Sequence, residues 1–554
     1  MTGPQAPATE SGPVRQAGGG IGRAAVLIGV ITVAARLVGF GRQLAFAHTV
    51  GNTCLGTAYA TANQVPNIIY DVVLGGALTS AVIPVLAGPV ARRIGAAGDK
   101  AGTAQAETTE TSQIASALLT WTVVLLAPVS VLIAVTAAPV VSVLLSGAPG
   151  CGRAAIVAVS TRMLAVFAPQ IVFYGLAVVL YGILQAHHRF TAPAIAPVLS
   201  SLVVIGAYFA FVPLGGAYRS RLGALPWSAD LMLSLGTTAG VAALALAALG
   251  PMLRLRLRLR PALRFPAGVA VRVRGLAAVG IAAFIAQDAS VVAVIVLANG
   301  HDGQGALVLY SYGWQMFFVP YAVLAVPIAT SAFPLLSARS GASFDGTAAS
   351  STRAVMLVSW LGAALLVGAA VPASRLFAAH SASGQLALTF VAFAPGLVGY
   401  GLAANLSRVL LACGRNRMAA FPMVGGWLLV IVADVVALAL VSARWVVPVL
   451  GLGNTIGLTV SGVALLGAVG RARGRAALRG TGRAAVAGLA GAVAGGAAGA
   501  AVSAAFPVSG FFRNAGVAAL ACACVVVVFG LAALVLDGSD LRAVAARARR
   551  RLPW

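Results

Sequence analysis

The chain has 554 residues, of which 60% are hydrophobic and only 9% are charged, and its formal net charge is +25. Soluble domains carry about 25% charged residues. The composition therefore excludes a soluble protein and one held by a single anchor, and it indicates an all-α integral membrane protein that crosses the bilayer many times.

Residues 1–22 are rich in proline, glycine and polar side chains, which predicts a disordered cytoplasmic tail. A spanning helix needs about 20 apolar residues, so the apolar runs that follow predict about fourteen spans. These spans are 24–48, 57–88, 114–146, 156–186, 191–213, 230–252, 274–298, 305–336, 354–378, 386–412, 418–442, 445–468, 484–506 and 514–536.

Most of the 37 basic residues lie in alternate loops, on the side where both termini also lie. Because basic loops stay in the cytoplasm, this asymmetry predicts a multi-pass protein of the plasma membrane with both termini cytoplasmic. The excess of arginine favours contact with anionic membrane lipids. The pattern gives no support for binding to nucleic acid.

Two short similarities indicate an internal repeat. "TSAVIPVL" (79–86) ends the second predicted span and "TSAFPLL" (330–336) ends the eighth. "LQAHHRFTAPAIAP" (184–197) joins spans four and five, and "LACGRNRMAAFP" (411–422) joins spans ten and eleven. An offset of six spans gives both halves the same orientation, an arrangement known in alternating-access transporters. Chance similarity in alanine-rich sequence remains the alternative.

The repeat and the basic segment between its halves predict two lobes around a central cavity, with two extra helices at the C-terminal end. The expected units are an N-lobe (23–252, spans one to six), a basic cytoplasmic linker (253–274), a C-lobe (275–468, spans seven to twelve), spans 13 and 14 (469–536) and a basic cytoplasmic tail (537–554).

Arg36 and Arg42 lie inside the first predicted span, "VAARLVGFGRQLAFAH", with no acidic residue nearby in the sequence. An arginine at the centre of a bilayer costs about 2.5–3.5 kcal/mol on insertion scales, so it needs a partner, water or a ligand. On a straight helix the two side chains diverge by about 120°; Gly39 and Gly41 would permit a bend that turns both into one cavity. Pairing of Arg36 with Asp71, Asp288 or Asp434 is the structural alternative.

Further polar groups inside predicted spans are candidates to line the same cavity. Asn63, Asn67 and Asp71 recur every four residues and therefore share one face of the second span. Gln287 and Asp288 in the seventh span and Gln315 in the eighth would supply polar groups from the other half. Asp434 in the eleventh span is interpreted as a helix-packing residue, with a cation site as the alternative.

No motif for catalysis or nucleotide binding is found. The chain has no G-x-x-x-x-G-K-[ST], H-E-x-x-H or nucleophile elbow, so we expect neither an enzyme, a metal site nor a cofactor. Transport would draw on an ion gradient or the membrane potential, and the sequence does not identify the ion. Cys54 and Cys151 both fall in predicted outer loops, which leaves open whether they form a disulfide.

Three segments resemble the MurJ/MviN family of lipid II flippases. They are "ARLVGFGRQLAFAHTVG", "QVPNIIYDVVLGGALTSAVIPVLA" and "LYGILQAHHRFTAPAIAPVLSSL". The resemblance implies two lobes around a cationic cavity and a groove for the polyprenyl tail at the last two helices. It also implies that Arg36 and Arg42 bind the diphosphate of a lipid-linked peptidoglycan precursor, since guanidinium groups bond phosphate oxygens bidentately.

The chain departs from this family pattern at four positions. Thr57 and Gly75 stand where or near where the family has acidic residues, and Tyr70 and Gln315 stand where it has arginines. Three alternatives therefore remain beside lipid II transport: export of another lipid-linked glycan, drug/cation antiport, and a transport-inactive scaffold that recruits cell-wall synthesis proteins.

Overall fold

The computed structural model describes residues 18–72, 101–147, 150–187, 189–255, 259–264, 269–301, 304–378 and 380–549. All regular structure in these ranges is helical. The helices in the N-terminal half are α1 (Gly18–Thr49), α2 (Cys54–Asp71), α4 (Ala101–Val135), α5 (Ala137–Leu144), α6 (Arg153–Phe167), α7 (Gln170–Ala186), α8 (Thr191–Gly215) and α9 (Trp227–Leu253). Those in the C-terminal half are α10 (Val269–His301), α11 (Ala306–Pro320), α12 (Val326–Ser337), α13 (Gly341–Gly368), α14 (Ala370–Phe377), α15 (His380–Phe393), α16 (Gly396–Ala412), α17 (Asn416–Leu438), α18 (Val446–Arg473), α19 (Thr481–Ala505) and α20 (Phe511–Arg549).

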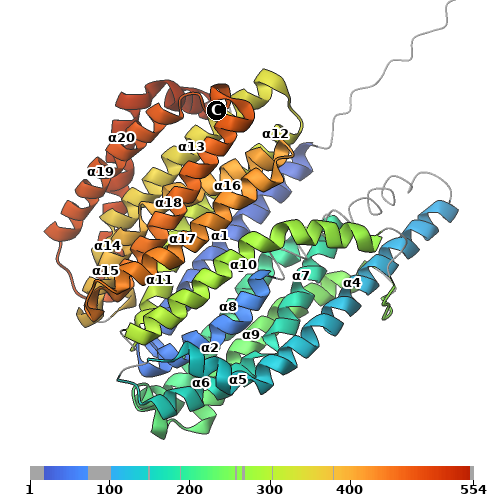
Figure 1. Cartoon of the computed structure of the whole chain (residues 1–554), viewed down its shortest axis with the longest axis vertical. Coiled ribbons are helices and arrows are strands. Elements are labelled where there is room, and N and C mark those ends of the chain that lie inside the picture. The colour runs from blue at the N-terminus through green and yellow to red at the C-terminus, as the bar shows by residue number, and fades with distance from the viewer. Residues whose placement is uncertain are drawn as a thin grey trace, which may run out of the picture.

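The helices form two bundles that lie side by side, one coloured blue to green and the other yellow to red (Figure 1). The same packing occurs in both. In the first bundle α8 packs on α9, α7 on α9, α4 on α7 and α2 on α6. In the second α17 packs on α18, α16 on α18, α13 on α16 and α11 on α15. Each contact in one bundle has its counterpart six spans later, as the predicted repeat requires.

Corresponding spans are also interrupted at corresponding places. The break between α6 and α7 falls at Ala168–Pro169, and the break between α15 and α16 falls at Ala394–Pro395. Both breaks lie in the same short sequence, Phe-Ala-Pro, in which the proline cannot donate a backbone hydrogen bond. Two eight-residue helices, α5 and α14, likewise follow single-residue breaks. The shared Phe-Ala-Pro breaks are a further repeat signal in the sequence.

Eleven helices in the described residues are long and apolar enough to cross a membrane, or twelve if the bent pair α15–α16 counts as one span. A many-span helical membrane protein is therefore confirmed, while the count of fourteen remains a prediction. Residues 73–88 of the predicted second span, and 1–17 of the predicted tail, lie outside the described residues. Helix α1 begins at Gly18 and α20 continues to Arg549, so both helices extend into the segments predicted as tails.

The two extra helices α19 and α20 pack on each other and on α13. Glycines on α19 allow this close approach: a Cβ at Gly488 would lie 2.4 Å from the Trp360 ring, and one at Gly499 would lie 2.5 Å from Val525. The small residues of α19 thus allow close helix packing, and the groove expected at these two helices remains a prediction. Its larger side chains, including Val486 and Val493, are exposed on the other side.

Close glycine packing yields a prediction for two adjacent residues of α17. A Cβ at Gly426 would lie 2.6 Å from Ser461 Cβ on α18, whereas a Cβ at Gly425 would meet nothing within 4 Å. Gly426→Val should therefore destabilise the protein by about 1–3 kcal/mol through overpacking, and Gly425→Val should be close to neutral. The thermal unfolding midpoint of the purified variants checks this; equal midpoints would contradict the packing.

The structure pairs Cys54, at the start of α2, with Cys151, in the loop before α6, in a disulfide whose Cα atoms are 5.5 Å apart. Cys413, Cys522 and Cys524 are free. We expect an alkylating reagent to label three cysteines of the denatured protein before reduction and five after it, as counted by intact mass. Five labels without reductant would contradict the disulfide.

Candidate functional site

A cavity of about 280 Å³ lies between the two lobes. Helices α1, α2, α7, α8 and α9 line it from the N-lobe, and α10, α11, α17 and α18 line it from the C-lobe. This volume is just below the roughly 300–1,000 Å³ of small-molecule sites. In this conformation the cavity therefore has room for a small molecule or for part of a larger one.

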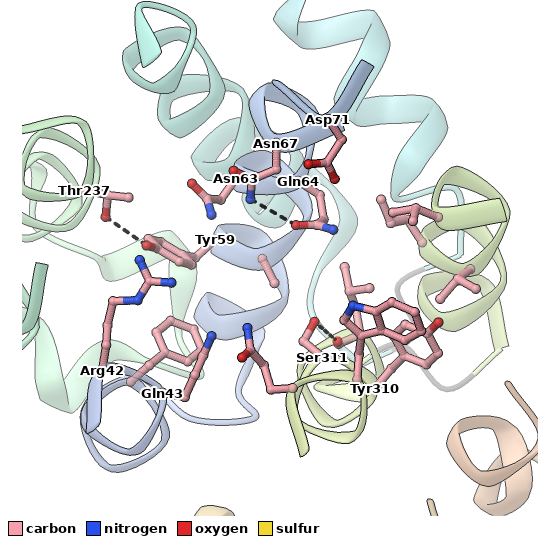
Figure 2. A pocket seen from close by; sticks show the side chains of 18 of the residues that line it. Arg42, Gln43, Tyr59, Asn63, Gln64, Asn67, Asp71, Thr237, Tyr310 and Ser311 are labelled. Carbon is pink, nitrogen blue, oxygen red and sulfur yellow. Dashed lines mark hydrogen bonds between the residues drawn. The ribbon is translucent and has the colours of Figure 1, made fainter. Parts of the chain in front are cut away.

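Arg42 is the arginine that lines this cavity. It is half-buried on α1, and Figure 2 shows its side chain directed toward Tyr59 of α2. Tyr174 and Tyr208 also lie close enough to feel its charge. Within the part of the chain that the structure describes, no carboxylate forms an ion pair with Arg42. Its charge is therefore available to an anionic ligand.

Arg36 lies elsewhere. Helix α1 runs through Gly39 and Gly41 without a break, so the two arginines keep different directions on the helix. Arg36 is exposed, and its guanidinium carbon is 5.7 Å from the centre of the Phe318 ring. It neither lines the cavity nor pairs with Asp71, Asp288 or Asp434 in the described residues.

The face of α2 predicted from the four-residue spacing does line the cavity. Asn63, Asn67 and Asp71 are all part of its wall, as Figure 2 shows. Asn67 donates to Gln64 Oε1 at 3.2 Å and accepts from the Tyr174 hydroxyl at 3.1 Å. These bonds hold one amide, while the buried Oδ1 of Asn63 has no hydrogen-bond partner in the described residues.

The predicted C-lobe residues divide between the cavity and the interior. Gln287 of α10 and Gln315 of α11 line the cavity. Asp288 does not: it is 4% exposed, and neither carboxylate oxygen has a hydrogen-bond partner among the described residues. Asp434 is completely buried on α17, where it packs against Gly453 of α18, and its carboxylate oxygens also have no hydrogen-bond partner among the described residues.

Sequence interpretation missed much of the wall. The additional carboxamides bring the number on the described wall to seven: Gln43, Asn63, Gln64, Asn67, Gln287, Gln315 and Asn454. Three aromatic side chains, Tyr310, Trp314 and Trp427, form the C-lobe side. Gln43 directly follows the predicted residue Arg42, and Trp314 directly precedes the predicted residue Gln315. These sequence positions could have identified both as lining residues. Aromatic residues in apolar spans, however, resemble ordinary packing until the fold is known.

The lobes meet beside the cavity, at the end where α2 begins. Asn299 of α10 is completely buried and donates from Nδ2 to Thr61 Oγ1 of α2 and to the carbonyl of Leu144 in α5, each at 3.0 Å. The Gly305 backbone N–H, just before α11, donates to Thr57 Oγ1 at 2.8 Å. Gly147 and Gly300 approach so closely that a Cβ on Gly147 would lie 2.4 Å from Gly300 Cα. These contacts close this end of the interface and are called the inter-lobe latch below.

Comparison with known proteins gives consistent matches over the chain. A family model described as "Lipid II flippase MurJ" matches residues 46–527. The lipid II flippase MurJ of Burkholderia cenocepacia is 26% identical over 323 residues, covering 57% of each chain. A probable lipid II flippase MurJ of Rhizobium tropici is 24% identical over 315 residues, covering 56% of this chain and 54% of that one. The chain thus spans little more than half the length of each of these relatives.

Solved structures show the same architecture. A lipid II flippase MurJ in an inward closed conformation superposes with a TM-score of 0.68 at 15% identity, covering 92% of this chain and 98% of that one. An inward-facing multidrug resistance transporter of the MATE family, in the MOP superfamily, has a TM-score of 0.61 at 13% identity, covering 80% and 98%. At such identities the likeness establishes the fold.

Proposed function

The chain belongs to the lipid II flippase MurJ family, and from this premise we propose that it moves a polyprenyl-diphosphate-linked peptidoglycan precursor, lipid II, from the cytoplasmic to the outer leaflet. The observation that carries the proposal is the family match over residues 46–527, together with a cavity between the lobes in which Arg42 lacks a carboxylate partner. A guanidinium in such a cavity is suited to a diphosphate, because its charge is permanent and its donors match phosphate oxygens.

The proposed mechanism is alternating access. The headgroup enters the cavity from the cytoplasmic side, Arg42 holds the diphosphate, and the lobes rock until the inter-lobe latch separates. Because the latch consists of few hydrogen bonds and close backbone contacts, modest binding energy from a ligand suffices to shift the balance between its closed and open forms. The polyprenyl tail stays in lipid, alongside the exposed face of α19 near Val486 and Val493.

The exposed arginines support one orientation of the chain in the membrane. Five arginines are exposed where α16 leads into α17 and where α18 ends: Arg415, Arg417, Arg471, Arg475 and Arg479. We place this end in the cytoplasm, against anionic lipid headgroups, with both termini on the same side. The disulfide and the latch then lie at the outer side of the plasma membrane. The driving force is an ion gradient or the membrane potential.

The test is translocation of labelled lipid II in proteoliposomes that contain the purified full chain. We expect accessible label to redistribute between the leaflets, and we expect no redistribution in protein-free vesicles. If well-folded protein moves another lipid-linked glycan but not lipid II, the cargo assignment is wrong. If it moves no lipid but exchanges cations, the antiporter interpretation gains support. If it moves nothing, a scaffold role remains.

A further inference from the structure

We propose that this cavity recognises the sugar part of its lipid-linked cargo, through unpaired carboxamides on both lobes and an aromatic wall on the C-lobe, while Arg42 alone holds the diphosphate. The inference rests on the proposed function and specifies which part of the headgroup the cavity selects.

The carboxamides supply hydrogen-bond capacity that the protein itself leaves unused. The half-buried side chains of Gln43, Gln287 and Gln315 line the cavity and make no hydrogen bond within the described part of the chain. The buried Oδ1 of Asn63 is also without a partner there. A carboxamide both donates and accepts, which matches adjacent sugar hydroxyls. The unpaired Asn63 Oδ1 is buried, and a buried polar atom left unpaired costs free energy. A ligand hydroxyl that donates to this oxygen would relieve that cost.

The aromatic wall gives the cavity an apolar platform opposite Arg42. Tyr310, Trp314 and Trp427 line the cavity, and the ring centres of Trp314 and Trp427 are 6.3 Å apart. Phe317 stacks on Trp314 at 5.2 Å, and Tyr400 contacts both tryptophans from behind. The rings are thus held by packing and are not free to rotate away. The electron-rich face of an indole attracts the polarised C–H groups on one face of a sugar ring.

The charges on the cavity wall suit a neutral sugar better than an acidic peptide. Apart from tyrosines, the ionisable groups among the described lining residues are Arg42 and Asp71, of opposite sign. A peptide with several carboxylates would require more cations than one guanidinium already engaged by a diphosphate. A neutral ring of hydroxyl and amide groups has no such requirement. The combination of amides, aromatic rings and a single cation therefore favours a glycan over the peptide.

The test compares equilibrium binding of three probes to the purified full chain in detergent by native mass spectrometry. The probes are polyprenyl diphosphate, the same lipid carrying the disaccharide without peptide, and complete lipid II. We expect the two sugar-bearing probes to bind alike, and about tenfold or more tightly than bare polyprenyl diphosphate.

Two C-lobe variants test the aromatic rings and the carboxamides separately. Trp314→Leu, and the double variant Gln287→Leu/Gln315→Leu, should each weaken both sugar-bearing probes by roughly tenfold and leave polyprenyl diphosphate unchanged. Trp314→Phe keeps an aromatic ring at this position. It should therefore retain most of the preference for the sugar-bearing probes, which shows that the site tolerates a substitution here and stays folded. The matched control is Trp445→Leu, because Trp445 is 39% exposed and lies outside the cavity lining.

Several results would overturn the inference. Equal binding of bare polyprenyl diphosphate and lipid II would do so, as would variants that weaken all three probes alike. Binding of complete lipid II without binding of the peptide-free lipid would assign recognition to the peptide. Each of these can occur while the protein still translocates lipid II, which leaves the proposed function intact. A wild-type chain that neither binds nor translocates any probe would reject the proposed function and the inference together.

Discussion

Arg42→Ala is expected to lower lipid II translocation by about 10- to 100-fold, the loss that corresponds to one or two hydrogen bonds between charged groups. Arg42 is the described arginine on the cavity wall, and no carboxylate there neutralises it. Removing it leaves the Asp71 carboxylate as the remaining charged side chain among the described lining residues, and that carboxylate would repel a diphosphate. Initial rates in proteoliposomes, at equal amounts of inserted protein, measure the effect. Arg42→Lys should recover part of the rate, because a lysine restores the charge but not the bidentate geometry.

Arg36→Ala is the matched control on the same helix. Because Arg36 is exposed and lies against Phe318 instead of lining the cavity, its loss should change the rate by less than about threefold, the scale of an exposed interaction. Equal losses for the two single variants would contradict this assignment. That result would mean that Arg36 reaches the ligand in another conformation of α1.

Asn299→Asp is expected to release the inter-lobe latch. The native amide donates to Thr61 and to the carbonyl of Leu144 across the lobe interface. A carboxylate cannot donate, so it would face the Leu144 carbonyl as a buried charge next to an acceptor. The ratio of closed to open protein should fall by about tenfold or more, as expected for an unpaired buried polar group. Translocation should slow, because the return from the open to the closed form becomes unfavourable.

A cysteine at Ser311, which lines the cavity, reports the state of the latch. With the free cysteines replaced by alanine, a bulky impermeant maleimide added on the side of the Cys54–Cys151 disulfide should label the Asn299→Asp protein faster than the parent. Asn405→Asp is the control: Asn405 is also fully buried and donates to a threonine, Thr352, but within the C-lobe. It should lower stability without faster labelling. Faster labelling in both variants would point to general loosening instead of the latch.

Composition and apolar run length were sufficient to predict the helical membrane fold, because a spanning helix must satisfy its own backbone and bury few charges. The offset of "TSAVIPVL" and "TSAFPLL" predicted two equivalent bundles, and the packing of α2 through α9 recurs in α11 through α18. Helical spacing alone placed Asn63, Asn67 and Asp71 on one face, and that face lines the cavity. These features depend on local periodicity, which the sequence carries directly.

The remaining features depend on how distant helices meet, and local periodicity does not contain that information. Arg36 and Arg42 are six residues apart on one apolar helix, yet only the packing of α1 against its neighbours determines that Arg42 lines the cavity while Arg36 lies against Phe318. Asp288 directly follows Gln287, and a helical turn of about 100° per residue is enough to place one in the interior and the other on the cavity wall. Trp314 and Trp427 become one aromatic wall only because α11 and α17 converge. The sequence by itself determined the kind of protein and the polar face of α2, whereas tertiary packing decided which charges, amides and rings share the cavity.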